Sequence, residues 1–170
     1  MPFLAELARH APQIRDDFTW MLGMLADPRH AYGEEFPAVQ AAVAAQVDLL
    51  LPLLNDADQR VREAAAYAAA RAGAAAGPLW RRWKVESDPA VSASLALALG
   101  HVDGPAASPV LADAAVNGPP AVRVAATVAL LRAGLAWPNG TVTAVVDAID
   151  DGATVIHGWA GPEAATTNSS

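Results

Sequence analysis

The chain has no cysteine, and only 6% of its residues are aromatic and 17% charged. Without cysteine, disulfide bonds and thiolate metal sites are excluded. The N-terminus lacks the basic stretch and long apolar core of a secretory signal, and no apolar run reaches the roughly 18 residues of a membrane span. We therefore expect a cytoplasmic protein without a membrane partner. The net charge of −7 also disfavours nucleic acid as a partner, because phosphate binding needs a basic surface.

Residues that commonly form catalytic or metal sites are scattered along the chain. The four histidines, His10, His30, His101 and His157, have no second ligand at a metal-binding spacing. No phosphate loop, nucleophile elbow or dinucleotide fingerprint is present. Adjacent carboxylates such as Asp150-Asp151 point about 100° apart on a helix and do not face a common substrate. The sequence thus predicts no catalytic centre, cofactor or metal.

Alanine is what the chain has in excess, at 42 of 170 positions. Alanine is the best helix former and leaves little space between packed helices, so this composition favours closely packed short helices. The stretch 141–146 alternates like a strand, but its position between helices favours a helix. Ten arginines against a single lysine, Lys84, indicate a GC-rich bacterial genome.

One short phrase occurs three times at a period of about thirty residues. Its anchor valines are Val61, Val91 and Val122, so the steps are 30 and 31 residues. Self-similarity at this period is typical of stacked helical repeats, in which each unit buries its apolar face against its neighbours. The expected fold is all-α, an α-solenoid of about four stacked antiparallel helix pairs.

Three regions are expected along the chain. Residues 1–46 contain N-terminal helices that read as a diverged repeat, and residues 47–152 contain the regular repeats. Residues 153–170 form a polar, flexible tail. The helices expected within these regions span 2–10, 13–26, 35–46, 48–54 with a bend at Pro52, 58–71, 77–86, 88–99, 104–116, 119–132 and 139–151.

The phrase Asp-x-x-x-Val-Arg-x-x-Ala-Ala at the start of each second helix resembles HEAT repeats, most closely the short PBS-lyase type. The first copy carries Asp58, Val61, Arg62, Ala65 and Ala66. The third copy carries Val122, Arg123, Ala125 and Ala126, whereas the middle copy has Asp88 and Val91 but Ser92 in place of the arginine. The resemblance implies a structural ladder between units that includes Asp58, Arg62 and Arg123. Ser92 weakens this ladder and predicts a softer joint.

A candidate binding face follows from equivalent positions in the three second helices. These positions hold Tyr67 and Arg71, then Leu97 and His101, then Arg132. In a solenoid they would line one concave surface, with an apolar strip beside a basic one. A basic residue in the last turn also stabilises any helix through its dipole, and this explanation needs no ligand.

The string Trp80-Arg81-Arg82-Trp83-Lys84 is the densest positive stretch. Its tryptophans share a helix face, which favours a place in the core, and a basic-aromatic patch for a partner is the alternative. The function that we expect is a non-catalytic scaffold or adaptor that binds an acidic or apolar protein segment. The family resemblance leaves two alternatives, a PBS-lyase-type pigment lyase or other small-ligand enzyme, and a nucleic-acid-binding repeat protein. The sequence does not define the oligomeric state.

Overall fold

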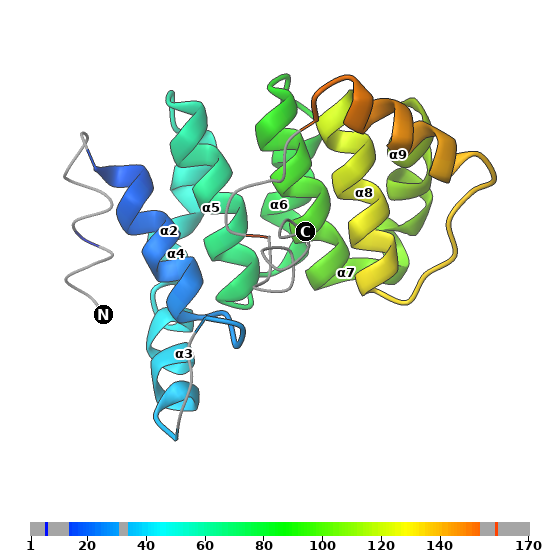
Figure 1. Ribbon diagram of the computed structural model, residues 1–170. Helices are drawn as coiled ribbons and strands as arrows, with labels where there is room; N and C mark the ends of the chain where they lie inside the picture. The colour runs from blue at the N-terminus through cyan, green and yellow to red at the C-terminus, as the bar shows by residue number, and fades with distance from the viewer. Residues whose placement is uncertain (1–5, 7–13, 31–33, 154–158, 160–170) are drawn as a thin grey trace, which may run out of the picture. The chain divides into compact units, whose positions relative to one another are not determined.

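The computed structural model describes residues 6, 14–30, 34–153 and 159. These residues form helices without any strand, which confirms the all-α class (Figure 1). The elements, in chain order, are α2 (Arg15–Leu25), α3 (Phe36–Ala44), α4 (Val47–Leu50), the 3-10 helix η1 (Leu51–Asn55), α5 (Gln59–Arg71), α6 (Ala76–Trp83), α7 (Pro89–Asn117), α8 (Pro120–Arg132) and α9 (Thr141–Asp150).

The chain divides into two compact units. Unit 1 comprises Met1–Ala74 together with His157–Ser170, and unit 2 comprises Ala75–Ile156. The predicted boundaries at residues 46 and 152 concern repeat organisation and stay a prediction, since a repeat array and its compact units need not share boundaries. The predicted helix over residues 2–10 and the predicted flexibility of the tail lie outside the described residues, except at Glu6 and Trp159 respectively.

Helix α5 is the centre of unit 1. It begins after Asp58, whose side chain accepts a hydrogen bond from the backbone N–H of Arg60 at 2.9 Å and so caps the helix. It ends before Gly73, which adopts a φ of +76° that suits glycine at a helix C-terminus. The helix expected over residues 58–71 is therefore confirmed. Helices α2, α4 and η1 all pack against α5.

The segment that precedes α5 changes helix type at Pro52. Helix α4 continues into the 3-10 helix η1, in which Pro52 occupies one of the first two positions. Proline removes a backbone donor and so disfavours a regular α-helix here. Where the sequence predicts a bend at Pro52, the structure shows a change to 3-10 geometry. No single described helix has the length and apolar composition to cross a membrane, although the pair Phe36–Ala44 and Val47–Asn55, bent by 54°, passes that test when taken together.

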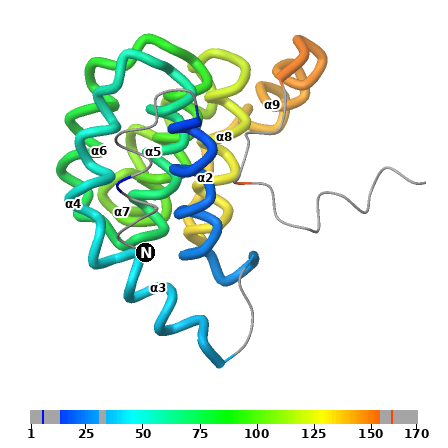
Figure 2. Tube along the Cα trace, turned by 90° about the vertical axis from the view of Figure 1, so that its left-hand side faces the viewer, coloured from blue at the N-terminus to red at the C-terminus, as the bar shows by residue number. Residues whose placement is uncertain are grey.

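Unit 2 contains the later helix pairs. Helix α7 spans two predicted helices and is interrupted at Asp103, whose φ of −148° and ψ of 37° are not helical. Its first half pairs with α6, and its second half leads into α8, against which α7 packs most extensively. A Cβ on Gly100 would lie 2.7 Å from the Cβ of Ala129 and one on Gly104 would lie 3.1 Å from that of Ala133, so α7 and α8 advance in the same direction where they touch. Helix α9 packs against α8 (Figure 2).

The core follows the predicted repeat register. Ala65, Ala69, Leu95 and Leu99, which the repeats predict to lie between helices, are all fully buried. Trp80 and Trp83 are half-buried, and the indole N–H of Trp80 donates to Asp103 at 3.0 Å, next to the break in α7. The Trp80–Lys84 string therefore lies partly in the core and partly on the surface. Its tryptophans are half-buried, whereas Arg81 and Lys84 are exposed.

Candidate functional site

The five residues predicted to form one concave face belong to both units. Tyr67 and Arg71 lie in unit 1, and Leu97, His101 and Arg132 lie in unit 2, so each set is described by itself. Tyr67 is fully buried and Leu97 is 4% exposed. The predicted exposed apolar strip is therefore wrong at these two positions. His101 and Arg132 are exposed, as a surface role requires.

Tyr67 is buried because α2 covers the face of α5 that carries it. A Cβ on Gly23 of α2 would lie only 2.5 Å from Cδ1 of the Tyr67 ring. Glycine therefore allows the closest approach of the two helices at this point. The ring of Trp20, also on α2, lies 5.0 Å from that of Tyr67 between centroids, with an angle of 42° between the planes. Repeat spacing could not reveal this cover, because α2 lies outside the repeated phrase.

The side chain of Asp27 contacts three polar side chains of unit 1, those of Arg29, Tyr67 and Arg71. Its side chain is inaccessible to solvent and follows the end of α2. Oδ2 accepts the Tyr67 hydroxyl at 3.0 Å and lies 3.0 Å from Nε of Arg71 in an ion pair. Arg29 donates its backbone N–H and its Nε to Oδ1, both at 3.0 Å, and its Nη2 to Oδ2 at 2.6 Å. A single buried carboxylate thus positions two arginines and a tyrosine.

These contacts shift the pKa values of the cluster. Burial alone would raise the pKa of Asp27, but hydrogen bonds from Arg29 and the charges of Arg71 and Arg29 outweigh it and lower this pKa from 3.8 to about 2. The hydrogen bond to Asp27 is the main cause that raises the pKa of Arg29. Burial, and then the charge of Asp27, raise the pKa of Tyr67. The tyrosine therefore stays neutral and donates its proton to a carboxylate that stays ionised.

Trp159 lies against this cluster and is 3% exposed. Its ring meets that of Tyr67 edge to face, with centroids 5.1 Å apart and planes at 71°. The Arg71 guanidinium lies over the Trp159 ring, 4.8 Å from the centroid, and Nη1 of Arg29 donates to the Trp159 carbonyl at 2.9 Å. We name Arg29, Tyr67 and Arg71, held by Asp27, the Trp159 seat.

Tyr67 and Arg71 were predicted site residues, whereas sequence reasoning missed Arg29, Asp27 and Trp159. The structure brings Tyr67 and Arg71 together, as the repeat register predicts. The sequence indicated no site role for Asp27, and it placed Trp159 in the flexible tail. Arg29 and Trp159 are 130 residues apart in the sequence, so no local pattern connects them.

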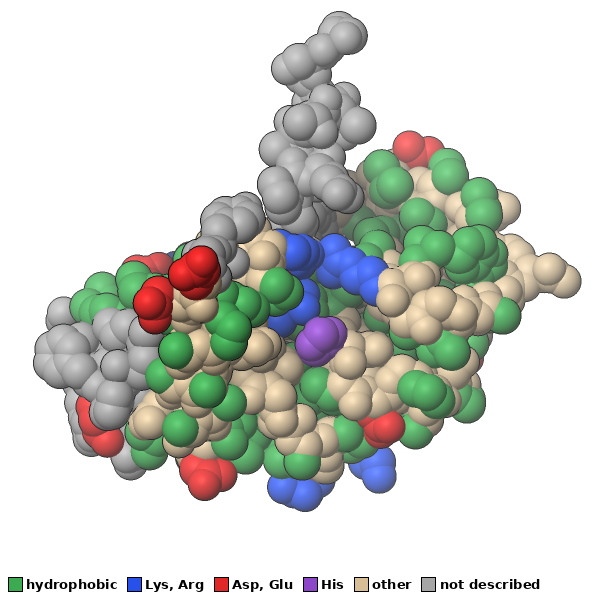
Figure 3. Space-filling view, turned by 90° about the horizontal axis from the view of Figure 1, so that it is seen from below, with side chains coloured by type: hydrophobic (Ala, Val, Ile, Leu, Met, Phe, Trp, Pro, Cys, Tyr) green, Lys and Arg blue, Asp and Glu red, His purple; other side chains and the backbone are tan. Residues whose placement is uncertain are grey.

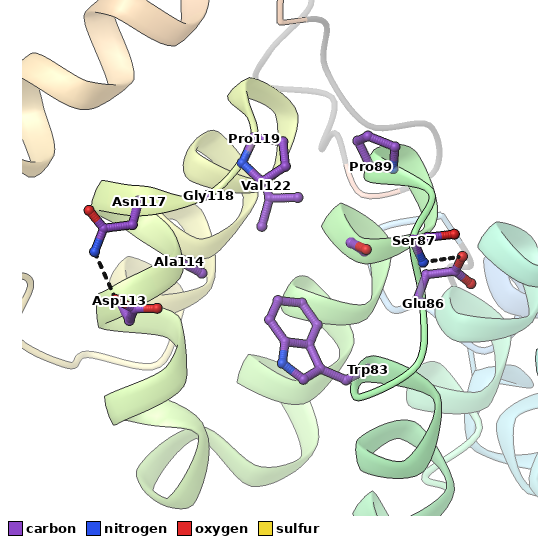
Figure 4. Close-up of a pocket in the computed structure, with 11 residues that line it drawn as sticks. Trp83, Glu86, Ser87, Pro89, Asp113, Ala114, Asn117, Gly118, Pro119 and Val122 are labelled. Carbon is purple, nitrogen blue, oxygen red and sulfur yellow. Dashed lines mark hydrogen bonds between the residues drawn. The ribbon is translucent and has the colours of Figure 1, made fainter.

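A second feature lies in unit 2, where residues from α6, α7 and α8 surround a pocket of about 330 Å³ (Figure 4). The Trp83 ring projects between the α6–α7 connection, which bears Glu86 and Ser87, and the end of α7, which bears Asp113 and Asn117. Ser92 lies in the wall, at the repeat position where arginine is missing. The pocket contains both aromatic and acidic groups.

The predicted ladder residues make short-range and long-range contacts. Asp58 caps α5, and Nη1 of Arg62 donates to the backbone carbonyls of Asp56 and Ala57, both at 3.0 Å. Nη2 of Arg123 reaches Asp151 at 3.4 Å, beyond the end of α9. Arg123 thus links two successive helices of unit 2, whereas Arg62 fastens the loop that leads into its own helix.

The distribution of surface side chains and the arrangement of possible metal ligands also bear on function. On the face that Figure 3 shows, hydrophobic and polar side chains of the described residues are mixed, without one large apolar patch. Among the described residues, no group of three His, Asp or Glu side chains has the arrangement needed to hold a metal ion. The recognition chemistry of the described chain is therefore best sought in the Trp159 seat and in the pocket at Ser92.

Comparison with known protein families gives a match to HEAT repeats over residues 47–132, about half of the 170-residue chain. This range begins with α4 and ends with α8, so it covers the helix pairs that carry the three repeated phrases. Searches among curated proteins and among solved structures gave no significant match. The helix pairs, their repeated phrases and this match together show that the chain belongs to the HEAT repeat family.

Proposed function

We propose that the protein is a non-catalytic interaction module that binds a polypeptide segment at the Trp159 seat. The observation that carries this proposal is the capture of Trp159, whose ring contacts Tyr67 and Arg71 and whose carbonyl accepts a hydrogen bond from Arg29. An aromatic side chain and a main-chain carbonyl are features that a partner peptide can also present. HEAT repeats generally mediate protein–protein interaction, which supports the proposal.

The charge of the Trp159 seat, and its occupation by Trp159, indicate which kind of segment would bind there. The seat holds two guanidinium groups and one ionised carboxylate, so it carries a net positive charge. A segment with an aromatic residue and acidic neighbours would complement it. Trp159 competes with such a segment, so the apparent affinity is the intrinsic affinity multiplied by the fraction of molecules in which Trp159 has left the seat. The partner therefore binds by exchange with Trp159.

The test uses the full chain with the substitution Trp159→Ala, which empties the seat. A fluorescent synthetic peptide of residues 153–165, which contains Trp159, is titrated with this variant, and binding is followed by anisotropy. We expect saturable binding that is weaker with the wild-type chain, because its own Trp159 occupies the seat. Binding should be lost when Arg71→Met is added, since the guanidinium over the ring is then absent.

The matched control is the same peptide with alanine at position 159. Circular dichroism of each protein variant confirms that its helices are retained. Equal binding of the tryptophan and alanine peptides would contradict recognition of an aromatic side chain. Equal binding by the Arg71→Met variant would show that the peptide binds elsewhere on the chain.

A further inference from the structure

The three repeats differ at the position that follows the anchor valine. It holds Arg62 in the first copy, Ser92 in the second and Arg123 in the third. Arg62 shows what an arginine does here: its Nη1 donates to the carbonyl oxygens of Asp56 and Ala57, six and five residues earlier. These residues form the loop that leads into the helix. In the first copy the chain thus supplies a guanidinium group to the loop before the helix, whereas in the third copy Arg123 pairs with Asp151 at 3.4 Å.

In the second copy the same position is vacant. The residues six and five before Ser92 are Glu86 and Ser87, and all three line the pocket of about 330 Å³ in unit 2. The serine side chain ends at its hydroxyl, several bonds short of where a guanidinium would lie. The pocket thus lies beside the loop that is equivalent, by position in the repeat, to the loop that Arg62 contacts in the first copy.

The lining of the pocket suits a cation. It contains two acidic residues, Glu86 and Asp113, and no lysine or arginine. Glu86 is buried and already satisfied, because Arg82 pairs with Oε2 at 2.6 Å and the backbone N–H groups of Ser87 and Asp88 donate to Oε1 at 3.0 Å. Asp113 is exposed at the opposite wall and accepts a hydrogen bond from Asn117 at 2.8 Å. The charge of Asp113 therefore faces an incoming ligand.

The indole ring of Trp83 bears on whether an arginine or a lysine side chain fits the pocket better. Its ring is half-buried and stands between the two polar walls of the pocket (Figure 4). A planar guanidinium can stack on an indole face while its edge donates hydrogen bonds in the plane, which a lysine ammonium cannot do in the same way. This geometry favours arginine over lysine.

We infer that the pocket at Ser92 binds the side chain of an arginine from a partner polypeptide, which takes the place of the arginine that this repeat lacks. Carbonyl oxygens of the Glu86–Ser87 loop would accept its hydrogen bonds, Asp113 would balance its charge, and Trp83 would stack on it. The inference rests on the proposed function only in that a polypeptide supplies the arginine. The pocket lies in unit 2 and the Trp159 seat in unit 1, so the two sites are tested separately.

The experiment uses the full chain labelled with ¹⁵N, which is titrated with N-acetyl-arginine methylamide and observed by NMR. We expect saturable shifts of the Trp83 indole N–H and of the backbone amides of Ser87 and Ser92. The matched probe is N-acetyl-citrulline methylamide, which has nearly the same shape but no charge. It should bind about tenfold more weakly or worse, because charge-assisted hydrogen bonds are the stronger ones.

Two variants locate the site. Ser92→Arg offers an internal guanidinium to the Glu86–Ser87 loop, so it should abolish the response to the arginine probe while the melting temperature stays at or above that of the wild type. Asp113→Asn removes the exposed charge with little change in shape and should weaken binding about tenfold. Asp150→Asn, an exposed carboxylate on α9, is the control and should change nothing.

The contrary results are equally definite. An absence of saturable shifts at Trp83, or equal binding of the arginine and citrulline probes, would overturn the inference. Unchanged binding by a folded Ser92→Arg variant would place the site elsewhere, and Asp113→Asn serves as the deciding variant if Ser92→Arg does not fold. Tighter binding of free L-arginine than of the capped probe would overturn a polypeptide source. None of these results affects the peptide titration at the Trp159 seat.

Discussion

Substitution of Asp27 by asparagine removes the buried negative charge that contacts Arg29, Tyr67 and Arg71. Asp27 is inaccessible to solvent and contacts both arginines. The asparagine has almost the same shape but leaves both guanidinium groups without their carboxylate. Breaking a buried pair in this way typically costs about 3–5 kcal/mol of unfolding free energy. We expect Asp27→Asn to lower the stability of unit 1 by a loss of this order.

The same carboxylate gives the wild type a dependence on acid. Its pKa falls from 3.8 to about 2 in the folded protein. A lowered folded-state pKa stabilises the fold above pH 3.8, and this contribution is lost as the pH falls towards 2. A difference of nearly two pKa units corresponds to about 2 kcal/mol. The wild type should lose this amount between these pH values, whereas Asp27→Asn should not.

The assay is urea unfolding followed by circular dichroism at several pH values from neutral to acid. It compares the wild type with Asp27→Asn and Asp150→Asn. Asp150→Asn is the control, because this exposed carboxylate should change stability by no more than about 0.5 kcal/mol. The reasoning would be refuted if Asp27→Asn unfolded at the wild-type urea concentration. It would also be refuted if its stability fell with acid as steeply as that of the wild type.

Three further substitutions test the packing by thermal unfolding. Tyr67→Phe removes only the hydroxyl that donates to Asp27 and should cost about 1.5–3 kcal/mol, and a loss near zero would show that this hydrogen bond contributes nothing. Gly100→Ala would place a Cβ 2.7 Å from that of Ala129 and should cost roughly 1–3 kcal/mol. Its control is Gly77→Ala on α6, where the nearest atom is the flexible Arg81 guanidinium at 3.6 Å, and this change should be neutral or stabilising. Gly73→Ala forces alanine into a φ of +76° and should cost about 1–2 kcal/mol, so an unchanged melting temperature would contradict the strained turn.

Local signals were sufficient to predict most helices. Asp58 and Asp88 cap helices through side-chain hydrogen bonds to nearby backbone N–H groups, and Gly73 ends one through its positive φ. Each of these effects involves residues a few positions apart, so the sequence shows them directly. The helices predicted over 88–99 and 104–116 correspond to the two parts of α7, which lie on either side of the non-helical residue Asp103. The chain departs from helical geometry only at Asp103, which accepts a hydrogen bond from Trp80, a residue of another helix.

The residues that surround Trp159 could be predicted only in part, because repeat spacing says nothing about what covers a helix. It grouped Tyr67 with Arg71, and these residues do share one seat. It did not show that Gly23 allows α2 to bury Tyr67, or that Trp159 lies against Arg71. Both partners come from outside the repeated phrase. By contrast, the absence of arginine at Ser92 could be recognised from the alignment of the repeats, and the pocket lies where that absence predicts a weaker joint.

A double-mutant cycle between Arg71 and Trp159 tests most directly whether this face binds an aromatic residue of a polypeptide segment. The unfolding free energies of the wild type, Arg71→Met, Trp159→Ala and the double variant are compared under the same conditions. The cycle cancels the effect of Arg71 on Asp27 and leaves the coupling between the guanidinium and the ring, which are 4.8 Å apart. We predict a favourable coupling of about 0.5–2 kcal/mol. A coupling of zero would show that Trp159 is not held by the seat and would contradict the proposed mode of binding.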